Sequence, residues 1–147
     1  MITGLILGGR LAALSQLVYI LVGLMGIPVF AHGGGPGYVL QPTFGYLLGF
    51  VGGAYVIGRL TERRELLKRS FLLVALVSGT VAIYVPGVSV LYLNLNLVQQ
   101  KAVSLSTAAK IGFILPLPGD LIKIAVVLYL GPLLHQRFSL ARMDVSG

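Results

Sequence analysis

The chain has 147 residues, of which 56% are hydrophobic and only 10% are charged. Because a soluble domain carries roughly a quarter charged residues, this composition excludes an ordinary soluble protein and indicates a membrane protein in contact with lipid. The net charge is +7. We therefore expect the basic residues to lie in loops between membrane spans, and not on a surface that binds nucleic acid.

Four apolar stretches are each longer than the roughly 17 residues that a membrane-spanning helix requires. They run from Leu11 to Phe30, from Pro42 to Leu60, from Ser70 to Leu93 and from Thr107 to Leu134. The stretch from Met1 to Gly9 is apolar but too short to cross alone, and it lacks the features of a signal peptide, so we expect the last two turns of a helix there. The sequence thus predicts an all-α integral membrane protein, multi-pass, with four full spans plus a partial N-terminal helix in a single domain over residues 1–147.

The basic residues indicate how the chain is oriented in the membrane. If four spans alternate, most lysines and arginines fall on one side, while Lys101 and Lys110 fall on the other and Lys123 lies inside the fourth span. Cytoplasmic loops are enriched in these residues, so we expect the loop from Thr61 to Arg69 in the cytoplasm and the glycine-rich loop from Gly33 to Gly37 outside. The residues expected on the cytoplasmic side are Arg10, Arg59, Arg63, Arg64, Lys68, Arg69, Arg137 and Arg142.

The second apolar stretch carries glycines at four-residue spacing. They are Gly45, Gly49 and Gly53, with Gly52 and Ala54 beside them. Small residues in this pattern let two helix backbones approach closely, which supplies van der Waals contact within lipid. We therefore predict that this stretch packs against another helix through its glycines.

Two opposite charges, Asp120 and Lys123, lie inside the fourth apolar stretch. Each costs about 2.5 to 3.5 kcal/mol at the centre of a spanning helix. Their spacing places them on one helix face, where they can neutralise each other, so a purely structural ion pair is one interpretation. A ligand or ion site is the other, and we favour it because two leucines would insert better and charges within membranes usually serve a function.

The residues just before Asp120 predict an interruption of the helix. Pro116 and Pro118 lack amide donors, and Gly119 adds conformational freedom. We expect a kinked or locally unwound backbone here, with carbonyl groups free to face a cavity. Broken helices at membrane depth often line binding sites, although a kink that serves packing alone is also common.

Two segments of the chain resemble one known family. They are GRLAALSQLVYILVGLMGIPVFAHGGGPGYVLQPTFGYLLGF, from Gly9 to Phe50, and LPGDLIK, from Leu117 to Lys123. In their order and spacing, GIPVFA, the glycine run, PTFGYLLGF and PGDLIK are similar to BioY, the biotin-binding S component of the energy-coupling factor (ECF) vitamin transporters. The resemblance covers essentially the whole chain. It implies a helical bundle of the ECF S-component type, with six helices, in the bacterial cytoplasmic membrane.

The resemblance further implies biotin uptake. In many members, the S component pairs with a transmembrane coupling protein and two ATP-hydrolysing subunits. The chain begins inside what resembles the family's second helix, so we expect an incorrectly chosen start or a truncated form, with weakened coupling and stability. The frame upstream of Met1 should then encode an apolar run of roughly 20 residues, the length of one span.

The chemistry of biotin suggests roles for the charged pair. Asp120 can accept hydrogen bonds from the ureido N–H groups, while Lys123 can meet either the ureido oxygen or the carboxylate. Gln41 and Thr43, at the mouth of the second stretch, and Tyr46, one turn further, are additional candidate contacts. Family members often carry a short polar residue or glycine at the position of Gln41, so the chain departs from the family pattern there.

Aromatic residues near the glycine-rich loop are candidates for enclosing the apolar part of the ligand. They are Phe30, Tyr38 and Phe44, although packing or anchoring at the membrane interface is the simpler explanation for each. The run from Gly33 to Gly37 is expected to form a mobile outer loop that can fold over the ligand.

Other function classes find less support in the sequence. Asp120 is the only acidic residue in any predicted span, which gives an intramembrane enzyme too few groups for hydrolysis. No Walker A motif is present, so the chain does not hydrolyse ATP itself. His32 and His135 are far apart and the chain has no cysteine, so we expect no metal and no cofactor. The remaining alternatives are an S component for another small vitamin-like solute and a structural or assembly subunit.

Overall fold

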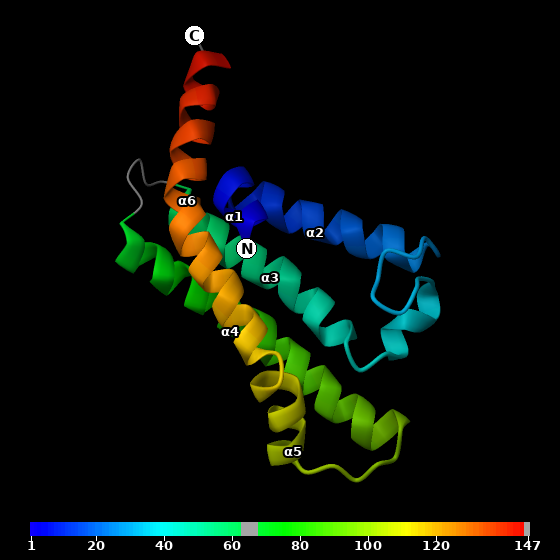
Figure 1. Cartoon of the computed structure of the whole chain (residues 1–147). Helices are drawn as coiled ribbons and strands as arrows, with labels where there is room; N and C mark the ends of the chain where they lie inside the picture. Colours follow the sequence, from blue (N-terminus) through cyan, green and yellow to red (C-terminus); the bar gives the residue numbers. More distant parts are fainter. Residues whose placement is uncertain (63–67, 146–147) are drawn as a thin grey trace.

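The computed structural model describes residues 1–62 and 68–145, and within that part of the chain the regular structure is helical. Figure 1 shows long helices crossing side by side, with α6 standing against the others along part of its length. The elements are α1 (Ile2–Leu7), α2 (Gly9–Leu24), η1 (Pro36–Leu40), α3 (Phe44–Thr61), α4 (Arg69–Leu93), η2 (Asn94–Val98), α5 (Leu105–Ala109), η3 (Lys110–Ile114) and α6 (Leu117–Val145).

Three helical segments among the described residues are long and apolar enough to cross a membrane. They are Phe44–Thr61, Arg69–Val98 and Leu105–Pro132, which correspond to the second, third and fourth predicted spans. Apolar side chains recur every four residues on the outer surface of α4, where Val77, Val81 and Val85 are 47 to 63% exposed. An exposed apolar stripe of this kind suits a helix that faces lipid, so the chain is a membrane protein.

The first predicted span is shorter in the structure than the sequence suggested. Helix α2 ends at Leu24, before Phe30, because Gly26 takes a φ of 105° and Pro28 offers no amide donor. Its 16 residues rise about 24 Å, which is less than the hydrocarbon core of a bilayer. The predicted helical N-terminal tail is confirmed as α1, and Gly8 with φ 79° separates it from α2.

The predicted packing face of α3 is confirmed, and its partner is α4. These two helices share the most extensive contact among the described elements. A Cβ atom added to Gly49 would lie 2.5 Å from the carbonyl oxygen of Ile83, and one added to Gly53 would lie 2.8 Å from that of Gly79. Gly52 is different, because a Cβ atom added there would lie 4.0 Å from its nearest neighbour, the carbonyl oxygen of Ala82 on α4. The glycines therefore allow the two backbones to approach closely.

A second contact between small residues lies on another face of α3, where the sequence analysis predicted none. A Cβ atom on Gly4 of α1 would lie 2.8 Å from the carbonyl oxygen of Ala54, and one on Gly9 would lie 2.9 Å from that of Tyr55. Helix α3 thus packs through small residues on two sides, against α4 and against the start of the chain.

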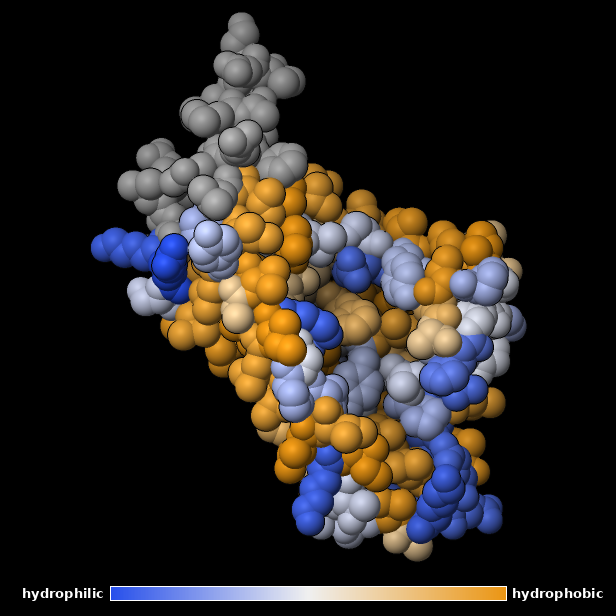
Figure 2. Space-filling model, viewed as in Figure 1, coloured by the Kyte–Doolittle hydropathy of each residue, from blue (hydrophilic) through white to orange (hydrophobic). Residues whose placement is uncertain are grey.

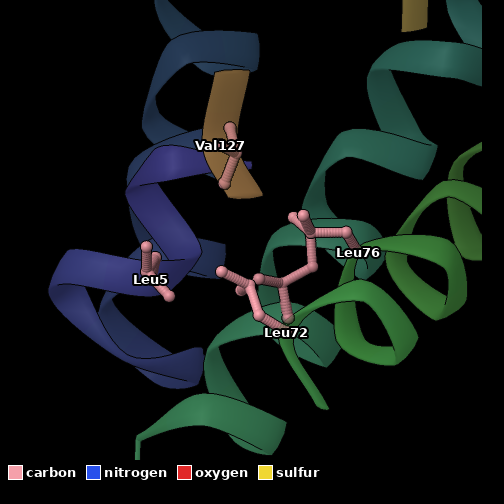
Figure 3. Packing of buried hydrophobic residues seen from close by; sticks show 5 residues of the cluster. Leu5, Leu72, Leu76 and Val127 are labelled. Atoms are coloured by element: carbon pink, nitrogen blue, oxygen red, sulfur yellow. The ribbon is translucent and has the colours of Figure 1, made fainter. Parts of the chain in front are cut away.

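One hydrophobic cluster joins four helices (Figure 3). Leu5 of α1 and Val127 of α6 meet residues of α3 and α4 there, and all of them are nearly or fully buried. The cluster fixes α6 against the other helices and so positions its charged residues. Its buried members are Leu5, Ile57, Leu72, Leu76 and Val127.

The described basic residues that were predicted to be cytoplasmic lie toward the same end of the molecule. The start of α2, the end of α3 and the start of α4 lie toward one end of the molecule, and the loop that contains Lys101 lies toward the other (Figure 1). Arg10, Arg59, Lys68 and Arg69 belong to the first end. Arg63 and Arg64, and the side chains of Arg137 and Arg142, lie outside the described residues. The cytoplasmic location of this end stays a prediction.

Candidate functional site

A cavity of about 480 Å³ lies among α1, α2, α3, α4 and α6. Figure 2 shows the molecule hollowed between α6 and the side formed by α2 and α3, with hydrophilic and hydrophobic residues both at its border. The volume falls within the range of roughly 300 to 1,000 Å³ that is typical of small-molecule sites. The cavity is lined by Met1, Ile2, Thr3, Gln16, Phe50, Ala54, Ile83, Asp120, Lys123 and Val127.

Asp120 and Lys123 form an ion pair at the wall of this cavity. The Nζ of Lys123 donates to Oδ1 of Asp120 at 2.8 Å, as their spacing on one helix face predicted. The side chain of Asp120 is 17% exposed and that of Lys123 is 68% exposed. The aspartate is therefore held within the protein, while the lysine retains donors for another partner.

The predicted interruption before Asp120 is confirmed. Residues Lys110–Ile114 form a π-helical turn, Leu115 and Pro116 form a turn, and α6 begins at Leu117. Asp120 consequently lies in the first turn of α6. Unpaired amide groups at a helix start favour a negative charge, which helps to accommodate this carboxylate within the membrane.

Tyr84 of α4 is a member of this site that the sequence analysis missed. It is buried, and its hydroxyl donates to Oδ2 of Asp120 at 2.5 Å. A tyrosine inside an apolar stretch gives no sequence signal that separates such a bond from ordinary packing. Only the relative placement of α4 and α6 reveals it.

Tyr46 lies next to this group but does not line the cavity. Its hydroxyl donates to the carbonyl oxygen of Gly112 at 2.6 Å, within the π-helical turn. Its ring meets that of Tyr84 edge to face, with centroids 6.0 Å apart. The structure thus brings Tyr46 close to the charged pair through Tyr84, while its hydroxyl is occupied by the backbone.

Gln41 and Thr43 lie apart from the charged pair and are not among the residues lining the cavity. The hydroxyl of Thr43 lies 3.3 Å from that of Tyr38, and the backbone of Gln41 closes the end of η1. The neighbouring carbonyl of Leu40 accepts a hydrogen bond from buried Asn94, which holds this end of η1 against the end of α4. Their contact with a ligand stays a prediction.

The aromatic residues of the glycine-rich region pack against one another. Phe30 meets Tyr38 with ring centroids 4.4 Å apart and Tyr19 with centroids 5.4 Å apart, and Phe44 packs against the same cluster. These residues do not line the cavity. The packing explanation therefore accounts for Phe30, Tyr38 and Phe44 in this structure.

The glycine-rich loop has a defined conformation beside α2. The amide of Gly35 donates to the carbonyl oxygen of Gly23 at 2.7 Å, and Phe30 and Gly33 exchange two backbone hydrogen bonds. Gly23 leaves room for the ring of Phe30, which a side chain there would displace. Movement of this loop over a ligand stays a prediction.

Gln16 of α2 lines the cavity and was also missed by the sequence analysis. With Thr3, Asp120 and Lys123 it supplies the polar part of a lining that is otherwise formed by apolar residues and Met1. The sequence did contain an indication of this role, because an uncharged amide side chain in the middle of an apolar stretch is unusual. A satisfied polar group was an equally good explanation until the helices were placed.

Metal binding finds no site in the described part of the chain. Among those residues, no group of three or more histidine, cysteine or acidic side chains lies close enough to hold an ion. The side chain of His135 is outside this description, so the expectation for the histidine pair is not tested.

Comparisons with known proteins all point to the same relatives. The model of the BioY family matches residues 1–140. A Lysinibacillus sphaericus protein named "Probable biotin transporter BioY" is 41% identical over 141 residues, covering 96% of this chain and 72% of that protein. The "Biotin transporter BioY" of Thermotoga maritima is 39% identical over 122 residues, covering 82% and 67%.

A solved structure has the same fold. It is the crystal structure of the S component for biotin from an ECF-type ABC transporter, with a TM-score of 0.77. The likeness covers 92% of this chain and 70% of that one, at 21% sequence identity. This match confirms the predicted helical S-component architecture.

Proposed function

Because the chain belongs to the BioY family, we propose that it takes up biotin across the membrane as the substrate-binding S component of an ECF-type transporter. The observation that carries the proposal is the Asp120 and Lys123 ion pair at the wall of a cavity of small-molecule size. The family consists of transporter subunits, so the expectation that the chain is not an enzyme is confirmed.

The chemistry of the cavity suits biotin. The ureido group of biotin has two N–H donors and one carbonyl acceptor, which match the carboxylate of Asp120 and the ammonium group of Lys123. Its thiophane ring and valeryl chain are apolar, and Phe50, Ile83 and Val127 offer apolar walls. Few polar groups in a mainly apolar pocket are typical of small-molecule sites.

The proposal also includes three predicted ligand contacts that lie outside the cavity lining. Gln41, Thr43 and Tyr46 are not lining residues, so a contact with biotin would require η1 and the start of α3 to approach the ligand. Tyr46 would also have to release the carbonyl of Gly112. Gln16, which does line the cavity, is the better candidate for a third polar contact.

The proposed partners follow from the same membership. They are a transmembrane coupling protein and two ATP-hydrolysing subunits, in the bacterial cytoplasmic membrane. The chain lacks a Walker A motif and therefore needs another source of energy for active uptake. Gly45, Gly49 and Gly53 of α3 are already packed against α4, so these glycines do not supply the surface for the partners.

The direct test is calorimetric titration of biotin into the purified protein in detergent. We expect saturable binding of one biotin, and no binding of riboflavin or thiamine at the same concentrations. The matched control is the double variant Asp120→Leu with Lys123→Leu, which should fold and lose binding. A double variant that binds biotin as tightly as the parent would reduce the pair to a structural role, and binding of a different vitamin would identify another substrate.

A further inference from the structure

The carboxylate of Asp120 is held by two donors from different helices. Tyr84 of α4 donates to Oδ2 at 2.5 Å, and Lys123 of α6 donates to Oδ1 at 2.8 Å. The tyrosine is 6% exposed, whereas the side chain of the lysine is 68% exposed. Tyr84 is thus the rigid partner of this carboxylate, and Lys123 is the flexible one.

Neighbouring aromatic rings fix Tyr84 independently of Asp120. Its ring meets Phe113 edge to face with centroids 4.9 Å apart, and it meets Tyr46 in the same way on another side. Tyr46 is anchored in turn by its hydrogen bond to Gly112. The Tyr84 hydroxyl therefore has its position set by packing among α3, α4 and η3, before any bond to Asp120 is counted.

We propose that Tyr84 is a positioning residue for ligand recognition: its hydroxyl orients the carboxylate of Asp120 so that the remaining lone pairs accept ureido N–H groups in the cavity. Each carboxylate oxygen can accept about two hydrogen bonds, so one bond from Tyr84 and one from Lys123 leave capacity for a ligand. A carboxylate with a fixed orientation binds more tightly because less side-chain entropy is lost on binding. This inference rests on the proposed function.

Substitution of Tyr84 by phenylalanine tests the inference, because it keeps the ring contacts and removes only the donor. We expect Tyr84→Phe to fold normally and to bind biotin about tenfold more weakly. Tyr129→Phe is the matched control, since Tyr129 is 68% exposed on α6, and it should bind like the parent. A Tyr84→Phe protein that no longer folds would assign the hydroxyl to stability and overturn the inference.

Two further measurements separate positioning from a general structural effect. In the Asp120→Ala background, Tyr84→Phe should cause no additional loss of biotin affinity, because Tyr84 acts only through Asp120. With biotin analogues methylated on one or the other ureido nitrogen, the loss caused by Tyr84→Phe should shrink for at least one of the two. Additive losses, or equal losses for biotin and both analogues, would contradict positioning.

The outcomes also distinguish this inference from the function on which it rests. A wild-type protein that does not bind biotin would remove both. A wild-type protein that binds biotin, together with a Tyr84→Phe variant of equal affinity, would remove only the role of Tyr84.

Discussion

The carboxylate of Glu62, at the end of α3, accepts a hydrogen bond of 3.0 Å from the backbone amide of Gly9, at the start of α2. The two residues are 53 positions apart in the sequence, and the bond joins the end of α3 to the start of α2. The amide of Gly9 belongs to the first turn of a helix, where N–H groups have no partner within the helix. The negative charge of Glu62 also complements the positive end of the α2 dipole.

Removal of this carboxylate should loosen the junction of α1 and α2. We expect Glu62→Ala to lower the free energy of unfolding by about 1 to 2 kcal/mol, since a bond from a helix amide to a charged acceptor is lost at a partly exposed position. Thermal unfolding in detergent would measure the change. Arg59→Ala is the control: it removes the exposed pair with Glu62 at 3.3 Å and should have a smaller effect. Equal losses of stability in the two variants would show that the bond from Gly9 to Glu62 does not stabilise the junction of α2 and α3.

The interface of α3 and α4 can be tested with a single methyl group. Gly49→Ala would place a Cβ atom 2.5 Å from the carbonyl oxygen of Ile83, so the two backbones would have to separate. We expect a loss of about 1 to 3 kcal/mol of stability. Gly52→Ala, three residues along the same helix, meets its nearest atom at 4.0 Å and should be neutral or slightly stabilising. Similar melting temperatures for both variants in detergent would contradict the packing role of the glycines.

The features that could be predicted are those that depend on residues close together in the sequence. Three of the four spans follow from long apolar runs, and the break before Asp120 follows from Pro116 and Pro118. The pairing of Asp120 with Lys123 follows from their spacing on one helix. The predicted end of the first span at Phe30 was wrong, because apolar residues continue past the turn at Gly26 and hide it.

Features that depend on the rotation and tilt of separate helices could not be predicted. Tyr84 is 36 residues from Asp120, and nothing in a run of apolar residues fixes which side of α4 faces α6. The same reason applies to Gln16 at the cavity and to the bond that Glu62 of α3 accepts from Gly9 of α2. Each of these residues has an ordinary explanation as packing or surface until the helices are assembled.

The role of Lys123 can be assigned with a modified ligand. Its Nζ lies 2.8 Å from Asp120, so both groups should meet the same end of biotin, where the ureido N–H and carbonyl are adjacent. We expect Lys123→Ala to lower the affinity for biotin and for biotin methyl ester by tenfold or more in each case, because a charge-assisted hydrogen bond to the ureido oxygen is lost. Calorimetric titration would compare the two ligands. A loss confined to free biotin would instead place Lys123 at the ligand carboxylate.

The orientation in the membrane can be tested directly, because the chain has no cysteine of its own. His32 and Lys68 are both exposed, on the glycine-rich loop and before α4 respectively. We expect a cysteine at position 32 in intact cells to react with a membrane-impermeant maleimide, and one at position 68 to react only after the cells are opened, as the excess of positive charge predicts. The reverse pattern would invert the topology and place the entry route for biotin on the other side.

The turn at Leu115 and Pro116 has a consequence for changes in chain length near the site. In a continuous α-helix, one inserted residue turns everything after it by about 100°, which would carry Asp120 away from its partners. Here the α-helical pattern gives way to a π-helical turn over Lys110–Ile114 and a turn at Leu115 and Pro116, and it starts again at Leu117. We expect an insertion within α5 to be absorbed partly at this turn, whereas the same insertion between Asp120 and Lys123 would separate the pair. We therefore expect a change of chain length to be better tolerated before the turn than within α6.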